Sequence, residues 1–376
     1  MHQVSDPISN PILVRIHDLS RGGSGVARLD SGEIVFVPFT APGDQVRVRI
    51  LEKNKTYSQG ELVEIVEPSS IRVAPRCAVF TRCGGCSWQH LPYSLQFETK
   101  KKGVLHALKR AGVSADAVPL DELPAKNPYS YRNRIQLRGT PARNELGFYG
   151  KGSSEVVPIE RCEIAHEDIN ETLPRIREEA RQKFDREYKV EIESPIRYVF
   201  NQKHAAFGFR QINDEQNAVL QTWVAEQAGS GPLLLDLYGG YGNLSRPLVD
   251  RFETIHCVDV SVPRERPDSL PESFQFHRSD VRGWLLRQSR EPDAVSAATV
   301  ILDPPREGLG ADFSEIEAAL SRSFRPEKLI LVGCDVDAFA RDTHRFLKRG
   351  YSLKKLGVLD LFPQTPHVES LALFSK

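Results

Sequence analysis

The stretch from Leu329 to Asp342 constrains the fold of this chain most. Its first five residues are mostly apolar and run into Cys334, and an amphipathic segment with two early aspartates follows. The pattern predicts a buried strand, a tight turn and a helix, with Cys334 at the carboxyl end of the strand. Ligands of open α/β sheets bind at that edge, and a helix N-terminus lowers a thiol pKa. A nucleophilic cysteine and a small apolar core residue are both consistent with this stretch alone.

The second half of the chain repeats the alternation of strand and helix. Five buried strands are predicted, and a closing antiparallel pair is predicted at 351–359 and 368–374. This order indicates a doubly wound α/β sheet. The five strands are Pro232–Leu237, Thr254–Asp259, Phe274–Asp280, Thr299–Asp303 and Lys328–Gly333.

Length and composition limit the class of protein. A chain of 376 residues suggests two or three domains. No apolar run approaches the 18 residues of a membrane span, and the N-terminus does not look like a secretory signal, so a cytoplasmic protein is expected. Lysine plus arginine equals aspartate plus glutamate at 50 each, but the window 97–143 holds ten basic and four acidic residues. A face that binds phosphates is expected there, with a solvated charged surface as the alternative.

The first 66 residues read differently. Short alternating strands separated by glycine and proline turns span 11–66, which suits a small OB-like barrel. A proline-containing linker at 68–75 follows, and helices are predicted at 93–109 and 167–188.

The loop Asp236–Asn243 predicts a nucleotide-like pocket. Its glycines follow a strand and precede a helix, where a ligand can approach the backbone closely. Asp236, Asp259 and Asp280 stand at the ends of successive strands. Three carboxylates suit a ligand with hydroxyls, an amine and a cationic centre, as in S-adenosylmethionine, and would repel a pyrophosphate. The alternative for each aspartate is a helix N-cap.

Four cysteines form a second candidate site. Cys77, Cys83 and Cys86 lie close in sequence and Cys162 follows a predicted strand. In a cytosolic chain such a cluster indicates metal binding rather than disulfides. Four thiolates suit a tetrahedral zinc or an iron–sulfur cluster, and the spacing leaves both open.

Taken together, these motifs resemble one family. The chain resembles the S-adenosylmethionine-dependent RNA uracil-5-methyltransferases, above all the 23S ribosomal RNA branch with a TRAM barrel and an iron–sulfur cluster. The resemblance spans essentially the full length. Its carriers are the four cysteines, Phe209–Asn213, Asp236–Asn243, Asp303-Pro-Pro-Arg306, Cys334 and His367-Val-Glu369.

The resemblance implies a class I methyltransferase sheet of the Rossmann-like type, preceded by an OB-like TRAM barrel and a central α+β iron–sulfur domain. The expected domains are 1–66, 67–205 and 206–376. The resemblance implies a [4Fe–4S] cluster on Cys77, Cys83, Cys86 and Cys162. It also implies that S-adenosylmethionine is bound by Gln211, Tyr238, Asn243, Asp259, Asp280 and Asp303.

The implied chemistry explains the residue types. Cys334 would be the nucleophile that adds to uracil C6, and Glu369 the base that removes the C5 proton. Asp303 would orient the uracil edge. The target base must leave its stack to reach the thiol, and the barrel and the 97–143 face would hold the RNA. A monomer acting on 23S ribosomal RNA is expected.

Two positions depart from the family pattern, and two other functions stay open. Asp335-Val336 follows the nucleophile where Asn-Pro is usual, and Asp259 stands where glutamate is usual. One alternative is an amino-methyltransferase that uses Asp303-Pro304-Pro305, although Arg306 replaces the expected aromatic residue. The other is a non-catalytic RNA-binding protein that keeps the cofactor pocket.

Overall fold

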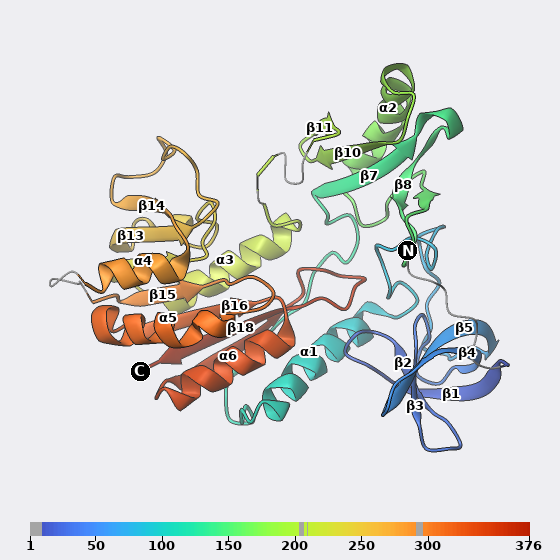
Figure 1. The fold of residues 1–376 in the computed structure, drawn as a ribbon, viewed down its shortest axis with the longest axis horizontal. Coiled ribbons are helices and arrows are strands. Elements are labelled where there is room, and N and C mark those ends of the chain that lie inside the picture. The colour runs from blue at the N-terminus through green and yellow to red at the C-terminus, as the bar shows by residue number, and fades with distance from the viewer. Residues whose placement is uncertain (1–9, 203–206, 209, 291–295) are drawn as a thin grey trace. The chain divides into compact units, whose positions relative to one another are not determined.

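The structure is a computed structural model that describes residues 10–202, 207, 208, 210–290 and 296–376. These residues form two compact units, each built from separate stretches of chain (Figure 1). The first unit takes residues up to 102, 126–208 and 362–366, and the second takes 103–125, 209–361 and 367–376. The division into three domains remains a prediction.

A closed barrel of five strands opens the first unit. Valine, isoleucine and alanine side chains at alternate positions fill its interior, as the period of two requires. Four strands were predicted, and the structure adds β2 next to the glycine-rich turn. The strands run in the order β1 (Ile12–Leu19), β2 (Gly25–Arg28), β3 (Ile34–Val37), β5 (Tyr57–Glu67) and β4 (Gln45–Lys53).

The remainder of the first unit is an antiparallel sheet covered by a helix. The helix α2 (Glu167–Lys183) packs Ile169, Leu173 and Ile176 into the sheet core. It ends five residues before the predicted helix does, because Tyr188 already begins a strand. The sheet order is β11 (Arg197–Phe200), β10 (Tyr188–Glu193), β7 (Arg134–Thr140), β8 (Glu145–Tyr149) and β9 (Val156–Pro158).

A short loop from far along the chain completes the first unit. Gln364 is 1% exposed, and its backbone carbonyl accepts hydrogen bonds from the amides of Ser87 and Trp88, both at 3.1 Å. Its own amide and side chain bond the side chain of Gln96, each at 3.0 Å. Gln96 lies on α1 (Tyr93–Arg110), the predicted helix. Residues 362–366 therefore belong to the core of this unit.

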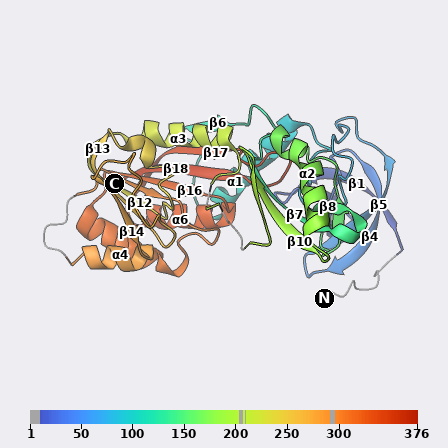
Figure 2. The same ribbon diagram turned by 90° about the horizontal axis from the view of Figure 1, so that it is seen from above.

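The second unit is an eight-stranded sheet with helices on both faces. Its five parallel strands were predicted to within about two residues, and the antiparallel β17–β18 pair closes the sheet. Figures 1 and 2 show α3 on one face and α4, α5 and α6 on the other. The helices are α3 (Asp214–Ala228), α4 (Val281–Gln288), α5 (Phe313–Ala319) and α6 (Val336–Lys348).

The order of the strands places the predicted site residues along one edge. The strands run in the order β14 (Phe274–Arg278), β13 (Phe252–Asp259), β12 (Gly231–Leu237), β15 (Thr299–Leu302), β16 (Lys328–Gly333), β18 (Glu369–Ser375), β17 (Ser352–Leu359) and β6 (Leu120–Leu123). The edge strand β6 was not predicted. It pairs in parallel with β17, although more than 200 residues separate them.

The basic window 97–143 is less exposed than expected. Lys100 is 2% exposed and donates to the Phe362 carbonyl at 3.0 Å. Arg134 forms an ion pair of 2.9 Å with the buried Glu193. These two cations stabilise the first unit. A phosphate-binding face formed by the window remains a prediction. Among the described residues, no helix is long and apolar enough to cross a membrane.

Candidate active site

Cys334 and Glu369 come together through strand register. β16 pairs antiparallel with β18, and Gly333 lies opposite Ser370. One further step in the same register places Cys334 opposite Glu369, where Cα atoms of antiparallel partners are about 5 Å apart. Glu369 is 6% exposed, and Cys334 is half-buried at the carboxyl end of β16. Two residues 35 positions apart in sequence thus form one pair.

Asp303 stands beside this pair. It follows β15, which pairs in parallel with β16, and its amide donates to the Leu237 carbonyl at 3.3 Å. Along the carboxyl edge the site residues therefore follow the strand order. They are Asp280, Asp259, Tyr238, Asp303, Cys334 and Glu369.

Burial and neighbouring charges disfavour the ionised forms of this pair. Burial, the charge of Glu369 and that of Asp303 raise the pKa of the Cys334 thiol to about 11, while Arg306 opposes the shift. Burial and then Asp303 raise the pKa of Glu369 well above its ordinary value, again against Arg306. Burial, Asp236 and Asp259 raise the pKa of Asp303 to about 7. The expectation that the helix N-terminus would lower the thiol pKa is wrong, because burial and neighbouring carboxylates outweigh it.

Asp335 is the N-cap of α6. Its Oδ1 accepts hydrogen bonds from the amides of Asp337 at 3.1 Å and Ala338 at 2.9 Å. The carboxylate therefore lies against the positive helix end, where its charge is stabilised. The charges that raise the pKa of the thiol are those of Glu369 and Asp303. The departure from Asn-Pro at 335–336 thus has a structural role as a cap.

The buried carboxylate of Asp236 packs against the glycine loop. It is 1% exposed and accepts a hydrogen bond from the Ser245 hydroxyl, while its Oδ1 has no hydrogen-bond partner among the described residues. Burial raises the pKa of Asp236 to about 6. A side chain at Gly239 would lie 2.6 Å from this carboxylate, whereas one at Gly240 would meet open space. The loop therefore closes over Asp236 and leaves room above Gly240.

The predicted cofactor residues surround this loop in different ways. Asp259 accepts hydrogen bonds from the amides of Gly240 at 3.2 Å and Ser261 at 2.6 Å. Tyr238 adopts a left-handed φ of 64°, and burial raises its pKa to about 12. Gln211 is half-buried two residues before Asn213, the N-cap of α3.

Two of the predicted residues have local structural roles. Asp280 is the N-cap of α4 and accepts from the Gly283 amide at 2.6 Å. Asn243 exchanges hydrogen bonds with Asn217 of α3, at 2.8 and 3.0 Å. Their binding of a cofactor remains a prediction.

The donor set fits S-adenosylmethionine. The unpartnered Asp236 oxygen and the open space above Gly240 belong to the end of β12 and the loop that follows it, and Asp303 follows β15, the neighbouring strand. Carboxylates with raised pKa values favour a cationic ligand, because its charge stabilises their ionised forms. A sulfonium ion satisfies this demand and a pyrophosphate does not.

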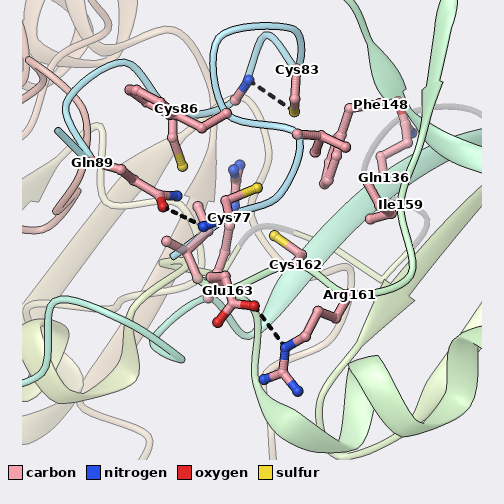
Figure 3. Close-up of a pocket in the computed structure, with 15 residues that line it drawn as sticks. Cys77, Cys83, Cys86, Gln89, Gln136, Phe148, Ile159, Arg161, Cys162 and Glu163 are labelled. Carbon is pink, nitrogen blue, oxygen red and sulfur yellow. Dashed lines mark hydrogen bonds and ion pairs between the residues drawn. The ribbon is translucent and has the colours of Figure 1, made fainter. Parts of the chain in front are cut away.

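The four cysteines of the first unit line one cavity of about 210 Å³ (Figure 3). Gln89 accepts a hydrogen bond from the Cys77 amide at 3.0 Å, and the Gly85 amide lies 3.4 Å from the Cys83 sulfur. Arg132 also lines the cavity, and its Nε has no partner among the described residues. Among the residues that the structure describes, no group of three or more His, Cys, Asp or Glu side chains is arranged so that it could hold a metal ion. A metal centre here remains a prediction.

Arg306 is the site residue that the sequence reasoning left without a role. It belongs to the Asp303-Pro-Pro-Arg306 motif, and its charge lowers the pKa of both Cys334 and Glu369. The sequence signal that could have identified Arg306 as a site residue is its place in this motif, three residues beyond the predicted strand Thr299–Asp303.

A doubly wound sheet with acidic residues, a glycine loop and a cysteine along its carboxyl edge defines the methyltransferase fold. A tRNA (uracil-54, C5)-methyltransferase of Pyrococcus abyssi, solved with S-adenosyl-L-homocysteine, has this fold over 96% of this chain and 99% of its own, at a TM-score of 0.71 and 22% identity. Residues 11–63 match the TRAM domain family, which corresponds to the barrel.

Relatives identify the family. An RNA methyltransferase of Bdellovibrio bacteriovorus is 30% identical over 97% of this chain and 95% of its own length. The 23S rRNA (uracil(1939)-C(5))-methyltransferase RlmD of Shewanella halifaxensis is 27% identical over 98% of this chain and 97% of its own. The chain belongs to the RNA methyltransferase family, and it is an enzyme.

Proposed function

We propose that this enzyme methylates C5 of a uridine in RNA, and that the RNA is 23S ribosomal RNA. The observation that carries the proposal is the Cys334–Glu369 pair across β16 and β18, with Asp303 on the neighbouring strand. An amino-methyltransferase needs no cysteine at this position. The activities of the Shewanella and Pyrococcus proteins, both uracil-C5 methyltransferases, support the same reaction.

The proposed reaction gives each residue one task. The Cys334 thiolate adds to C6 of uracil, and the electron pair moves toward C5, which becomes nucleophilic. S-adenosylmethionine supplies an electrophilic methyl group when bound. After C5 has gained the methyl group, the Glu369 carboxylate removes the C5 proton. The S–C6 bond then breaks, so the thiolate is released and the aromatic ring is restored.

The site must gain positive charge before Cys334 can react. The raised pKa of the thiol leaves it protonated near neutral pH. Arg306 already opposes that shift, and a cationic cofactor close to Asp303 would act in the same direction. Gln211, Tyr238, Asn243, Asp259, Asp280 and Asp303 are the residues proposed to hold the cofactor. The enzyme is proposed to act as a monomer in the cytoplasm.

A substrate analogue tests the covalent step. A 23S ribosomal transcript containing 5-fluorouridine is incubated with the enzyme and S-adenosylmethionine. Glu369 cannot remove fluorine as a proton, so the Cys334–C6 adduct should persist on a denaturing gel. Cys334→Ala should give no adduct. Glu369→Gln should trap an adduct with ordinary uridine, because C5 keeps its proton.

Each other outcome contradicts part of the proposal. An adduct that survives Cys334→Ala eliminates Cys334 as the nucleophile. Transfer of labelled methyl to an exocyclic amine would establish the amino-methyltransferase alternative. Absence of transfer to any RNA would favour a protein that only binds RNA.

We also propose that the cysteine cavity holds a [4Fe–4S] cluster. The support is the set of four thiols around one cavity, together with a buried Arg132 nitrogen that lacks a partner among the described residues. Four thiolates are also the ligand set of a tetrahedral zinc ion, so the metal content decides between zinc and a cluster.

Iron content tests the cluster. Anaerobically prepared enzyme should contain iron and sulfide and absorb near 400 nm. Cys86→Ser should lose that iron, whereas Cys334→Ser, a matched change outside the cavity, should retain it. A colourless preparation that contains zinc, or no metal, would refute the cluster.

A further inference from the structure

The outer face of α6 carries a basic stripe that the proposed reaction does not use. Four cations lie four, three and one residues apart, a spacing that puts them on one side of a helix. They are Arg341, Arg345, Lys348 and Arg349. His344 lies one turn before Lys348 on the same surface. This stripe runs away from the active-site edge toward the last turn of the helix.

The stripe ends in a cavity of about 230 Å³. His344, Arg345, Lys348 and Arg349 line it from α6, and Gly310, Ala311, Phe313 and Ser314 line it from the opposite segment. No carboxylate is among these lining residues. The cavity therefore presents positive charge and a hydroxyl to solvent.

Contacts from α6 fix the wall of this cavity in place. Arg345 donates to the Gly310 carbonyl at 2.7 Å, and its guanidinium lies 5.4 Å from the centre of the Phe313 ring. Asp342 accepts from the Leu309 amide at 2.7 Å. The segment is continuous with the Asp303-Pro-Pro-Arg306 motif. A ligand would meet a preformed surface, which lowers the entropic cost of binding.

Buried carboxylates pair with three of the four cations of the stripe and leave Lys348. Asp342 is 1% exposed and lies 3.3 Å from Arg341 and 3.6 Å from Arg345. Glu317 is 5% exposed and lies 3.7 Å from Arg349 and 3.5 Å from Lys376. Lys348 is exposed, and the described part of the chain offers it no hydrogen-bond or ion-pair partner. At least this ammonium group is available to an anion.

We propose that this cavity and the stripe leading to it bind phosphates of the substrate RNA outside the target nucleotide. α6 rises about 1.5 Å per residue, so the cavity lies about 15–20 Å from Cys334 along the helix. A lysine and arginines around a cavity suit phosphodiesters, which need charge without base recognition. This inference rests on the part of the proposed function that makes RNA the substrate, and it does not depend on which atom of the RNA is methylated.

A charge reversal with a matched control tests the site. Lys348→Glu is compared with Lys354→Glu, an equally exposed lysine on β17 outside the cavity. RNA affinity is measured without S-adenosylmethionine over a range of salt concentrations, with an unmodified 23S ribosomal transcript. Lys348→Glu should weaken binding about three- to tenfold and lower the salt dependence by about one phosphate contact. Lys354→Glu should behave as wild type.

Turnover gives a second measurement. With Lys348→Glu, KM for RNA should rise while kcat at saturating RNA stays unchanged, because the contact is made equally before and during reaction. Equal losses in the two variants would show a general charge effect and overturn the site. Wild-type affinity and salt dependence in Lys348→Glu would overturn it as well. The adduct test with 5-fluorouridine is independent of either result.

Discussion

At the scale of single residues, the carboxyl groups near Cys334 oppose the ionisation that its proposed reaction requires. Glu369 and Asp303 both raise the pKa of the Cys334 thiol, and Arg306 lowers it. A thiol with a raised pKa is slow to react and to oxidise near neutral pH, since only the thiolate is nucleophilic. Arg306 is the charged side chain that shifts the balance toward the thiolate.

Arg306→Gln should move the pH profile of the enzyme. Wild-type kcat/KM should rise with pH, because the Cys334 thiol, whose pKa is raised to about 11, must lose its proton to react, and the pKa of Glu369 is raised as well. Removing the cation should raise both pKa values further and displace the profile by about one to two pH units toward alkali. Steady-state kinetics from pH 6 to 9.5 would measure this.

Arg306→Lys is the control for that displacement. It keeps the positive charge, so its profile should stay close to that of wild type even if the rate falls. A profile of unchanged position in Arg306→Gln, with only a lower plateau, would show that Arg306 does not act through the thiol.

Little of this electrostatic balance could be predicted from the sequence. The positions of Cys334 and Asp303 at strand ends follow from local patterns, and both were predicted. The pKa values depend on burial and on neighbours from three strands, which no local pattern contains. The pairing of Cys334 with Glu369 likewise appears only once the β16–β18 register is known.

At the scale of elements, α6 joins the reactive strand to the basic cavity, and its first turn depends on Asp335. Asp335→Ala should destabilise the second unit by about 1 kcal/mol, because two amides lose their acceptor. Asp335→Asn keeps the cap and should stay within about 0.5 kcal/mol of wild type. Urea unfolding measures both values.

The same pair of variants tests the effect of Asp335 on the thiol. The rate of Cys334 alkylation against pH should be alike in Asp335→Asn and wild type, because the carboxylate faces the helix. An apparent thiol pKa that falls by a full unit in Asp335→Asn would show that Asp335 suppresses the nucleophile.

The strands show why some elements were predicted and others were missed. The buried parallel strands are continuous apolar runs, and such runs can be recognised as strands from the sequence alone. β2 and β6 have four residues each, and β6 contains two acidic residues. Both are strands because a partner lies beside them, and the partner of β6 is β17, far along the chain. Such pairing leaves no local signal.

At the scale of the whole molecule, the first unit depends on residues 362–366. Gln96→Ala should expose this loop, because the Gln364 amide and side chain and the Trp88 and Leu91 carbonyls lose a partner. The expected cost is about 2–4 kcal/mol. Hydrogen exchange at the Gln364 and Thr365 amides should rise.

Thr99→Ala is the matched control on the same helix. Among the described residues, the Thr99 hydroxyl bonds only the Leu95 carbonyl of its own helix, at 2.8 Å, so its loss should cost little. Equal exchange rates in both variants would show that Gln96 does not hold the loop.

The interleaving of the two units bears on how the chain is made. Along the sequence the chain passes from one unit to the other after residues 102, 125, 208, 361 and 366. During synthesis on a ribosome, domains that are continuous in sequence can fold one after another. Here the first unit lacks part of its core until residue 366 has emerged, by which time nearly all of the second unit has been synthesised. The first unit can therefore be completed only when the second has nearly all been synthesised.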